Sequence, residues 1–349
     1  MKRLPQALVI VEMAALEELT ARALKNAGAR SGMAAAAARV LVKTESLGVP
    51  SHGIARVPFY CSMLRAGRAD GSAVPRPLRR HEAVYLLDNA DALVFESCEM
   101  AVKEAIVRAE KYGVGVGAIA NGGHAGALGV YLAPVAERGL AGIAMCNGPA
   151  AIPPWGGKRA LYSTSPIAVC FPRAHAEPVA MDLSLTTVAR GRVMLAAQKG
   201  ESIPEGWALD REGRPTTDPH EVLTGGGTLF PIGGMKGSML ALMVEALCAC
   251  LTGSSIGPEI DSYFSEQGTK PRSGHLFIVL SPEAFAGRDA FQDRLEKIVT
   301  LMLAENGVRL PGARRHAARA TVLRDGVALP ARLYEKLQEL AQSFGHPHA

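Results

Sequence analysis

The sequence has few cysteines and no long uninterrupted run of apolar residues. Its six cysteines in 349 residues show no framework spacing, and Cys248 and Cys250 stand two apart in a predicted helix, which points them to different faces. The longest apolar stretch, 237–253, contains Glu245 and falls short of the ~20 residues that span a bilayer. The N-terminal segment is interrupted by acidic residues, unlike a secretory signal. We therefore expect a cytoplasmic protein with free thiols and no membrane partner.

Charge of one sign is not in large excess either. Lys and Arg number 38 against 33 Asp and Glu, so the net charge is +5. This small excess is spread along the chain, so it indicates no nucleic-acid partner and suits an anionic small molecule equally well. With 48% apolar and 20% charged residues, the composition excludes a disordered chain, a coiled coil and a collagen-like fibre.

Signatures of metal and nucleotide binding are also missing. The nine His form no H-x-x-x-H pair on a predicted helix, and the sequence has no C-x-x-C and no Walker A motif. A loose G-x-G-x-x-A occurs at 115–120, but it follows a predicted helix, whereas the dinucleotide fingerprint follows a strand and opens a helix. We therefore predict no metal site and no Rossmann fingerprint.

The pattern of apolar residues predicts an α/β fold with helical ends. Short apolar runs bounded by Gly, Pro, Asn or Asp predict buried strands at 84–88, 114–120, 141–146, 167–171, 179–182 and 275–280. Composition and amphipathic spacing predict helices at 17–27, 34–47, 95–112, 129–138, 187–199, 238–251, 291–306 and 331–344. Gly- and Pro-rich composition predicts loops at 65–80 and 200–224, with a turn at 210–213.

The segment 50–60 carries the first candidate site. His52, Arg56 and Tyr60 are spaced at i, i+4 and i+8, which places them on one face if the segment is helical. Arg binds a carboxylate bidentately, and the pKa of His suits proton transfer near neutral pH. An internal proline and glycine weaken such a helix, so the alternative is a surface helix capped by Ser51.

Three further segments place polar groups at predicted strand or helix ends. His124 stands among glycines after a strand, where a ligand can approach the backbone. Lys236 stands where the Gly-rich 225–237 enters a helix, an arrangement that can hold a phosphate. Hydroxyls at 163–165 and the pair Asp182 and Ser184 can hold ribose or amide groups. Ordinary turns and tight packing are the alternatives for each segment.

Taken in order, these segments resemble the malate/L-lactate dehydrogenase family of the second type. That family includes ureidoglycolate, sulfolactate and 2,3-diketogulonate oxidoreductases, and reductases of Δ1-piperideine-2-carboxylate and Δ1-pyrroline-2-carboxylate. The matching motifs are S-H-G-x-x-R at 51–56, N-x-x-H-x-G-A at 121–127, P-x-G-G at 154–157, A-R-G-x-V at 189–193, I-P-E-G-W-A-L-D at 203–210, P-T-T-D-P at 215–219, G-G-x-K-G at 233–237, L-M-V-E at 242–245 and R-L-P-G at 309–312. The resemblance covers about 10–340 of the chain.

The resemblance implies a non-Rossmann α/β fold with a central mixed, largely antiparallel sheet flanked by helices. It implies a helical substrate and dimerisation domain from 1–80 plus 300–349, a cofactor-binding α/β domain at 81–299, and a homodimer. The implied activity is hydride transfer to or from C2 of a small anionic carboxylate, a 2-oxo or 2-hydroxy acid or a cyclic imine 2-carboxylate. The implied cofactor is NAD or NADP, with NADPH favoured.

The resemblance also assigns roles to residues. His52 matches the acid/base position, and Ser51, Arg56, Tyr60 and His124 match positions that line the substrate pocket. Six residues fall in segments that touch the cofactor in relatives: Thr164, Asp182, Ser184, Gly234, Lys236 and Arg309. The alternative hypothesis, a non-catalytic regulator that binds a nucleotide or metabolite, predicts that some of these residues are lost, and none is.

Departures from the family pattern bear on substrate and cofactor preference. Ser165 stands where the family commonly has Asn, and Leu183 where it commonly has Met. Ala125 replaces a frequent aromatic residue after the second His and enlarges the predicted pocket, and Ala313 replaces an acidic residue. Two segments, 233–238 and 268–271, look closer to the cyclic-imine reductases than to the ureidoglycolate enzymes.

Overall fold

The computed structural model describes residues 7–263, 265 and 267–342. The helices are α1 Met13–Asn26, α2 Ser31–Ser46, α3 Val57–Arg65, α4 Phe95–Tyr112, α5 Ala133–Glu137, α6 Arg190–Lys199, α7 Pro219–Leu223, α8 Met235–Glu245, α9 Arg288–Leu303, α10 Ala313–Asp325 and α11 Ala331–Ala341. The strands are β1 Leu8–Val11, β2 Arg76–His81, β3 Val84–Asp88, β4 Val114–Gly122, β5 Ala141–Cys146, β6 Ile167–Phe171, β7 Val179–Leu183, β8 Ala208–Leu209, β9 Pro215–Thr216, β10 Thr228–Leu229, β11 Ser273–Leu280 and β12 Val327–Pro330. Within this described part, every helix is too short or too polar to cross a membrane.

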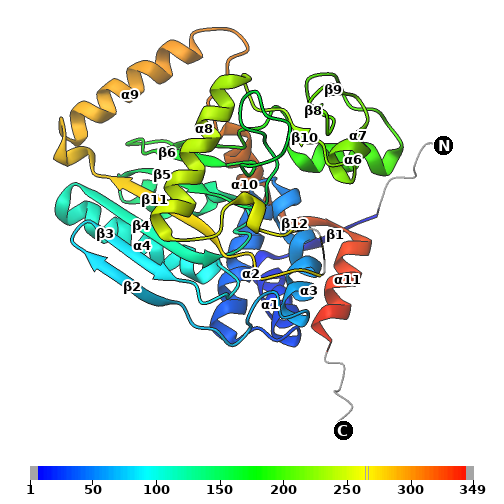
Figure 1. The fold of residues 1–349 in the computed structure, drawn as a ribbon. Helices are drawn as coiled ribbons and strands as arrows, with labels where there is room; N and C mark the ends of the chain where they lie inside the picture. The colour runs from blue at the N-terminus through cyan, green and yellow to red at the C-terminus, as the bar shows by residue number, and fades with distance from the viewer. Residues whose placement is uncertain (1–6, 264, 266, 343–349) are drawn as a thin grey trace.

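A seven-stranded sheet forms the centre of the molecule (Figure 1), in the order β2-β3-β4-β11-β5-β6-β7. Only β3 and β4 run parallel, and every other neighbouring pair is antiparallel. The predicted mixed, largely antiparallel sheet is therefore confirmed, and all six predicted strands are present. Because a Rossmann fold needs a parallel sheet, this topology agrees with the failed fingerprint.

Helix α4 packs on one face of this sheet, and the glycines of β4 make the close approach possible. The helix turns Ala101 and Ala105 toward β4, and both are fully buried. A Cβ on Gly117 would lie 2.2 Å from the carbonyl oxygen of Ala101, and one on Gly115 would lie 1.9 Å from that of Ala105. The G-x-G of this segment therefore serves helix–sheet packing, because any side chain there would push α4 away.

Helix α8 and the π-helical turn that follows it, Ala246–Cys250, cover the opposite face. Val244 and Cys248 are fully buried and pack with Leu276 of β11. A Cβ on Gly274 would lie 2.0 Å from the carbonyl oxygen of Cys248, so glycine is needed where the turn meets the sheet. The predicted helix at 238–251 is present, and it begins three residues earlier than expected.

The two chain ends form one helical region, as the resemblance implies. Strand β1 pairs antiparallel with β12, and α1 packs against α11 (Figure 1). Two buried residues, Val327 and Leu337, join the core of α1 and α2. The boundaries at 80 and 300 stay a prediction. The end of the last predicted helix, 343–344, lies outside the described residues.

Three local predictions are wrong or incomplete. The segment 200–224 is not a loop: it holds β8, β9 and α7, and its apolar side chains form a separate small core with Val193 and Leu229. Strands of two residues are too short to show the alternation of apolar and polar residues, so they cannot be predicted from the sequence. The turn at 210–213 is present, and the amide of Gly213 donates to the Asp210 carbonyl at 3.0 Å.

The other two corrections involve β2 and α5. Strand β2 lies in the predicted loop 65–80. All six of its residues are exposed at the sheet edge, so it has no apolar face to reveal it. The predicted helix 129–138 is a 3-10 turn, Leu128–Leu132, followed by the short α5, because Pro134 fits only the first turn of an α-helix.

Candidate active site

The segment 50–60 does not form the continuous helix that its i, i+4, i+8 spacing predicts. It forms two 3-10 turns, Pro50–His52 and Ile54–Arg56, and then α3, with Pro58 in the first turn of that helix. Proline suits this position because its missing N–H has no partner there in any helix. The alternative surface helix capped by Ser51 is also wrong.

A half-buried carboxylate fixes the turn that carries His52. Glu45 of α2 accepts a hydrogen bond from the backbone N–H of Ile54 at 2.8 Å. A Cβ on Gly53 would lie 2.2 Å from the same Glu45 oxygen, so the glycine makes this contact possible. Burial raises the pKa of Glu45, and the hydrogen bond from Ile54 partly opposes this shift. Sequence reasoning missed Glu45 because nothing in its spacing connects it to His52.

His52 and His124 lie face to face at the centre of the site. Their ring centroids are 5.7 Å apart with an interplanar angle of 20°. The hydroxyl of Tyr60 lies 2.5 Å from Nδ1 of His124, and the amide of Gly126 donates to the same nitrogen at 3.4 Å. Burial raises the pKa of Tyr60, so its phenol stays neutral and donates. His124 then carries its proton on Nε2, where it can donate to a substrate oxygen.

Polar contacts between strand ends hold the glycine loop that presents His124. Asn121 adopts a left-handed φ of 55°, and its amide donates to Asp88 at the end of β3 at 2.9 Å. Asn89 in turn donates to the carbonyl oxygen of Asn121 at 3.1 Å. A Cβ on Gly122 would lie 2.6 Å from the ring of the fully buried His275, so this loop needs glycine where it crosses β11.

The charge pattern of the site suits an anion. Burial, with the nearby charges of Arg56 and Arg315, lowers the pKa of His52 to about 4. Burial also lowers the pKa of His124 well below its usual value, and the charges of His52 and Arg56 add to this shift. Both imidazoles are therefore neutral at neutral pH beside a charged guanidinium. Arg56 Nε donates to the Ser51 carbonyl at 2.7 Å, and the Ser51 hydroxyl lies 2.9 Å from Nδ1 of His52.

The structure adds Tyr263, which sequence reasoning missed. Its ring lies edge-on to His124, with centroids 5.3 Å apart and an angle of 73°. The loop that carries Tyr263 is anchored by Arg68, a residue of 2% relative exposure that donates to the carbonyls of Thr269 and Ser262 at 3.2 Å each, and to that of Ser265. These contacts join residues about 200 positions apart, so no sequence pattern could reveal them.

The predicted cofactor residues Thr164 and Ser184 lie on adjacent segments. The amide of Leu185 donates to the Thr164 carbonyl at 2.9 Å, and the amide of Ile232 donates to the Leu185 carbonyl at 2.9 Å. The Gly-rich loop before α8 therefore lies beside the segment that follows β7. Gly234 in this loop has a φ of 64°, and the exposed Lys236 stands in the first turn of α8.

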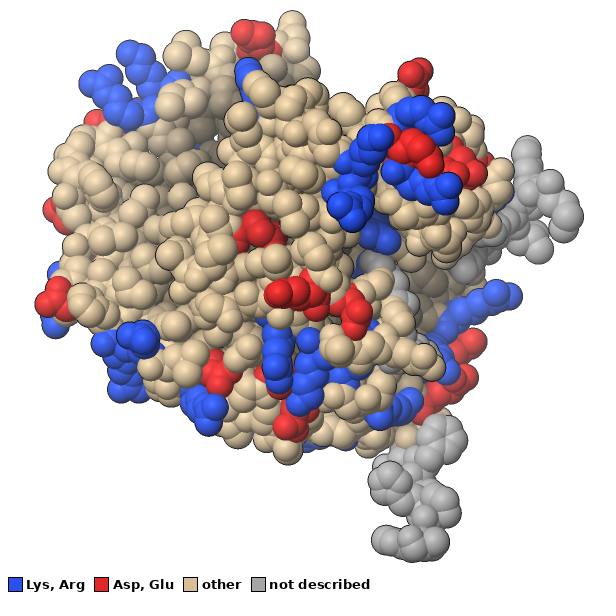
Figure 2. Space-filling view, in the orientation of Figure 1, with Lys and Arg blue, Asp and Glu red and all other residues tan. Residues whose placement is uncertain are grey.

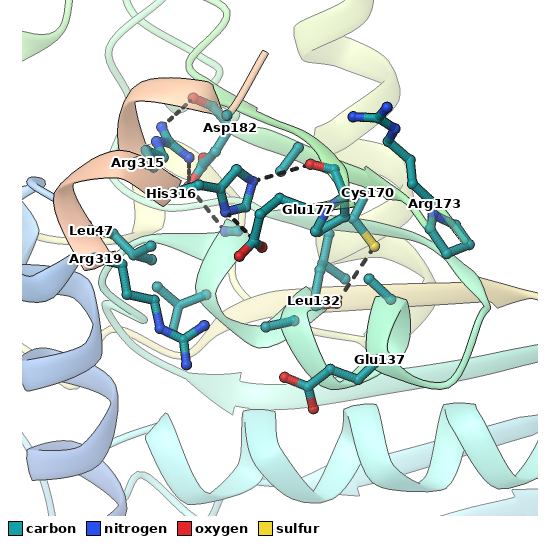
Figure 3. A pocket seen from close by; sticks show the side chains of 18 of the residues that line it. Leu47, Leu132, Glu137, Cys170, Arg173, Glu177, Asp182, Arg315, His316 and Arg319 are labelled. Carbon is teal, nitrogen blue, oxygen red and sulfur yellow. Dashed lines mark hydrogen bonds and ion pairs between the residues drawn. The ribbon is translucent and has the colours of Figure 1, made fainter. Parts of the chain in front are cut away.

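Asp182 lies between two adjoining cavities of about 640 and 770 Å³. It accepts a hydrogen bond from the amide of Gly129 at 3.0 Å and pairs with Arg315 at 3.6 Å (Figure 3). Burial raises the pKa of Asp182, against the hydrogen bond from Gly129 and the charge of Arg315. The exposed Arg309 lines the larger cavity. Of the six predicted cofactor residues, Asp182 and Arg309 therefore line these cavities, whereas Thr164, Ser184, Gly234 and Lys236 line neither of them.

These features fit a nicotinamide dinucleotide. Cavities of this size match small-molecule sites, and the arginines that line them suit a ligand with two phosphates. Arg315, which lines both cavities, is also one of the two charges that lower the pKa of His52. Among the residues that the structure describes, no group of three His, Cys, Asp or Glu side chains is placed to hold a metal ion.

Comparison with known proteins agrees with this geometry. Residues 11–338 match the family described as malate/L-lactate dehydrogenase. The chain is 40% identical to (2R)-3-sulfolactate dehydrogenase (NADP(+)) of Chromohalobacter salexigens over 96% of this chain and 98% of that protein. It is 38% identical to Δ1-pyrroline-2-carboxylate/Δ1-piperideine-2-carboxylate reductase of Pseudomonas syringae pv. tomato over 84% of this chain and 85% of that protein.

A solved structure shares the whole fold. The crystal structure of Δ1-piperideine-2-carboxylate reductase from the same Pseudomonas superposes with a TM-score of 0.89 at 35% identity, covering 95% of this chain and 99% of that one. The family match spans far more than half of the chain, and the fold is the same from end to end. The chain therefore belongs to the malate/L-lactate dehydrogenase family and is an oxidoreductase.

Proposed function

We propose that this enzyme transfers hydride between a nicotinamide cofactor and C2 of a small carboxylate, either a 2-oxo or 2-hydroxy acid or a cyclic imine 2-carboxylate. The observation that carries the proposal is the cluster of His52 and His124 beside Arg56. Arg56 binds the carboxylate, and Nε2 of His124 donates to the oxygen or nitrogen on C2. When bound, the cofactor supplies or accepts the hydride.

His52 is the proton donor and acceptor in this proposal. Its low pKa leaves it neutral in the free enzyme, ready to accept a proton from a hydroxy acid. In the reductive direction the substrate carboxylate cancels the charge of Arg56. Because that charge is one cause of the lowered pKa, substrate binding raises the pKa of His52 and favours the protonated form that donation requires.

Two relatives support the substrate class, and one of them supports the preference for NADP(H). The relative at 40% identity is named as an NADP(+)-dependent sulfolactate dehydrogenase, and the one at 38% as a cyclic-imine reductase. Both substrates carry a carboxylate beside the reacting carbon, so one pocket with an Arg and a His serves either.

The test is oxidation of NADPH and NADH, followed by absorbance at neutral pH. The substrates are Δ1-piperideine-2-carboxylate, Δ1-pyrroline-2-carboxylate, 3-sulfopyruvate, pyruvate, oxaloacetate and 2-oxoglutarate. Turnover of the imines alone would define an amine-forming reductase, and turnover of the open-chain acids alone a hydroxy-acid dehydrogenase. No turnover of any of them would contradict the proposed substrate class.

The homodimer is also a proposal, and the outer face of α8 supports it. Met235, Met239 and Leu242 are 43%, 59% and 52% exposed, and Figure 2 shows few charged side chains over this helix. Exposed apolar patches of this kind mark interfaces. The division into a helical domain at 1–80 plus 300–349 and a cofactor-binding domain at 81–299 is part of the same proposal. So is a location in the cytoplasm, where reducing conditions would keep the free cysteines as thiols.

Light scattering after size-exclusion chromatography tests the dimer. Met239→Glu should convert the dimer to monomer, because a carboxylate would be buried at the contact. Val107→Glu, at a residue 51% exposed on α4, is the matched control and should leave the mass unchanged. A wild-type monomer, or a dimer that survives Met239→Glu, would overturn this interface.

A further inference from the structure

The 640 Å³ cavity beside Asp182 has a wall of cations that the catalytic proposal does not use. The cavity lies between α2, α5, the β6–β7 connection and α10 (Figure 3). Four cationic side chains line it: Lys43, Arg173, Arg315 and Arg319. Three carboxylates, Glu137, Glu177 and Asp182, line it as well.

Ion pairs account for two of these cations and for two of the three carboxylates, Asp182 and Glu177. Arg315 pairs with Asp182 at 3.6 Å, and Arg173 pairs with Glu296 at 2.7 Å. His316 pairs with Glu177 at 3.2 Å when its ring is protonated, and its Nε2 lies 3.1 Å from the Pro178 carbonyl oxygen (Figure 3).

Lys43 and Arg319 differ from these pairs. Within the described part of the chain, no carboxylate oxygen lies within 4 Å of either cationic group. Burial lowers the pKa of Lys43, and the charge of Arg319 lowers it further, against smaller opposing effects of Glu137 and Glu99. Two half-buried cations on one cavity wall, neither with an ion-pair partner among the described residues, favour the binding of an anion in that cavity.

The position of this wall identifies the anion. The cavity shares Asp182, Gly312 and Arg315 with the neighbouring cavity that Arg309 lines, so the two together suit an extended ligand. The shared Asp182 is held in place through its Oδ2, which accepts from Gly129 and pairs with Arg315.

We propose that this cavity receives the adenosine end of NADP(H), and that Lys43 and Arg319 bind its 2′-phosphate and so select NADP(H) over NAD(H). The inference rests on the proposed use of a nicotinamide cofactor, and it assigns the selection to two helices, α2 and α10, from opposite ends of the chain. NAD(H) has no anion at this position and gains nothing from either cation.

Calorimetric titration of the full-length protein with 2′,5′-ADP and with 5′-AMP tests this without any turnover. The wild type should bind 2′,5′-ADP at least about tenfold more tightly than 5′-AMP. Lys43→Met and Arg319→Gln should each weaken 2′,5′-ADP about 10- to 100-fold, the range for a charge-assisted hydrogen bond, and change 5′-AMP less than about twofold. Arg324→Gln is the control, since Arg324 lies further along α10, exposed and paired with Asp325 at 2.7 Å.

Several outcomes would overturn the assignment. Equal affinity of the wild type for 2′,5′-ADP and 5′-AMP would show that there is no 2′-phosphate site here. An equal loss of affinity for both nucleotides in the variants would show that the two cations attract anions without recognising the 2′-phosphate. Thermal melting controls for misfolding, and light scattering controls for loss of the dimer. If Lys43→Met fails to fold, Arg319→Gln alone still tests the proposal. If the proposed substrate class is wrong, the preference for 2′,5′-ADP should still be observed. If the protein binds neither NADPH nor NADH, both the proposed function and this inference are contradicted.

Discussion

His52, Tyr60 and His124 lie packed against one another, whereas Lys236 and Arg309 on the cofactor side are exposed and stand apart. The first group is held by contacts within the protein: a 2.5 Å hydrogen bond from Tyr60, the carboxylate of Glu45 behind the turn, and the ring of Tyr263. In the second group, Arg309 lines the 770 Å³ cavity, and Lys236 stands exposed in the first turn of α8.

The difference follows from what each region has to do. Proton transfer needs side chains fixed to within a fraction of an ångström and shielded from water, which only packing provides. A long, charged cofactor must enter and leave, so its contacts are more exposed and each contributes less. Substitutions in the packed cluster should therefore cost much more than substitutions of the exposed Lys236 and Arg309.

The largest effect is expected for His52→Ala. Removing the proton donor should lower kcat about 10²- to 10⁴-fold while NADPH binding, measured by fluorescence, stays within about twofold. His81→Ala, at an exposed His on β2, is the matched control. Full activity in His52→Ala would transfer the proton role to another group, with His124 the first to test.

A smaller effect is expected for Arg68→Met, which removes the anchor of the loop that carries Tyr263. Three carbonyls lose their donor, so the free energy of unfolding should fall by about 1–3 kcal/mol and kcat/KM for the organic substrate by about tenfold. The Kd for NADPH should not change. Arg65→Met, at the exposed last residue of α3 and three positions before Arg68, controls for loss of charge. A drop in stability with unchanged kcat/KM would show that the loop position does not matter to the site.

Lys236→Ala should have a weaker effect, confined to the cofactor. An exposed cation near a phosphate contributes about 0.3–1 kcal/mol, so the Kd for NADPH should rise about two- to fivefold with kcat unchanged. Lys25→Ala, exposed at the end of α1, is the control. A large fall in kcat would show that Lys236 takes part in the reaction itself. It would then contradict the expected difference between the His52 cluster and the exposed cofactor-side residues.

The smallest change is a shift in titration. Arg56→Gln removes one of the charges that lower the pKa of His52, so that pKa should rise from about 4 toward the usual 6.5. Protonated His52 then persists to higher pH in the variant. Titration of the imidazole by NMR in the free enzyme measures this directly, with Arg324→Gln as control. An unchanged pKa would mean that burial alone sets it.

Much of the sheet was predictable from the sequence, because its central strands are buried on both faces. The runs at 84–88, 141–146 and 167–171 coincide with β3, β5 and β6. The edge strand β2 and the two-residue strands at 208–229 were not predictable, since neither an all-exposed strand nor so short a one carries a period.

The residue types of the substrate site were also determined by the sequence, in the motif at 51–56 and in His124. Only the tertiary structure decided how they meet. It replaced the expected helix with two 3-10 turns around Glu45, brought Tyr263 onto His124 by way of Arg68, and set Lys43 and Arg319 on one cavity wall. The physical reason is distance along the chain: local sequence fixes which groups are available and how the backbone turns. Contacts between residues about 200 or more positions apart arise only when the whole core packs.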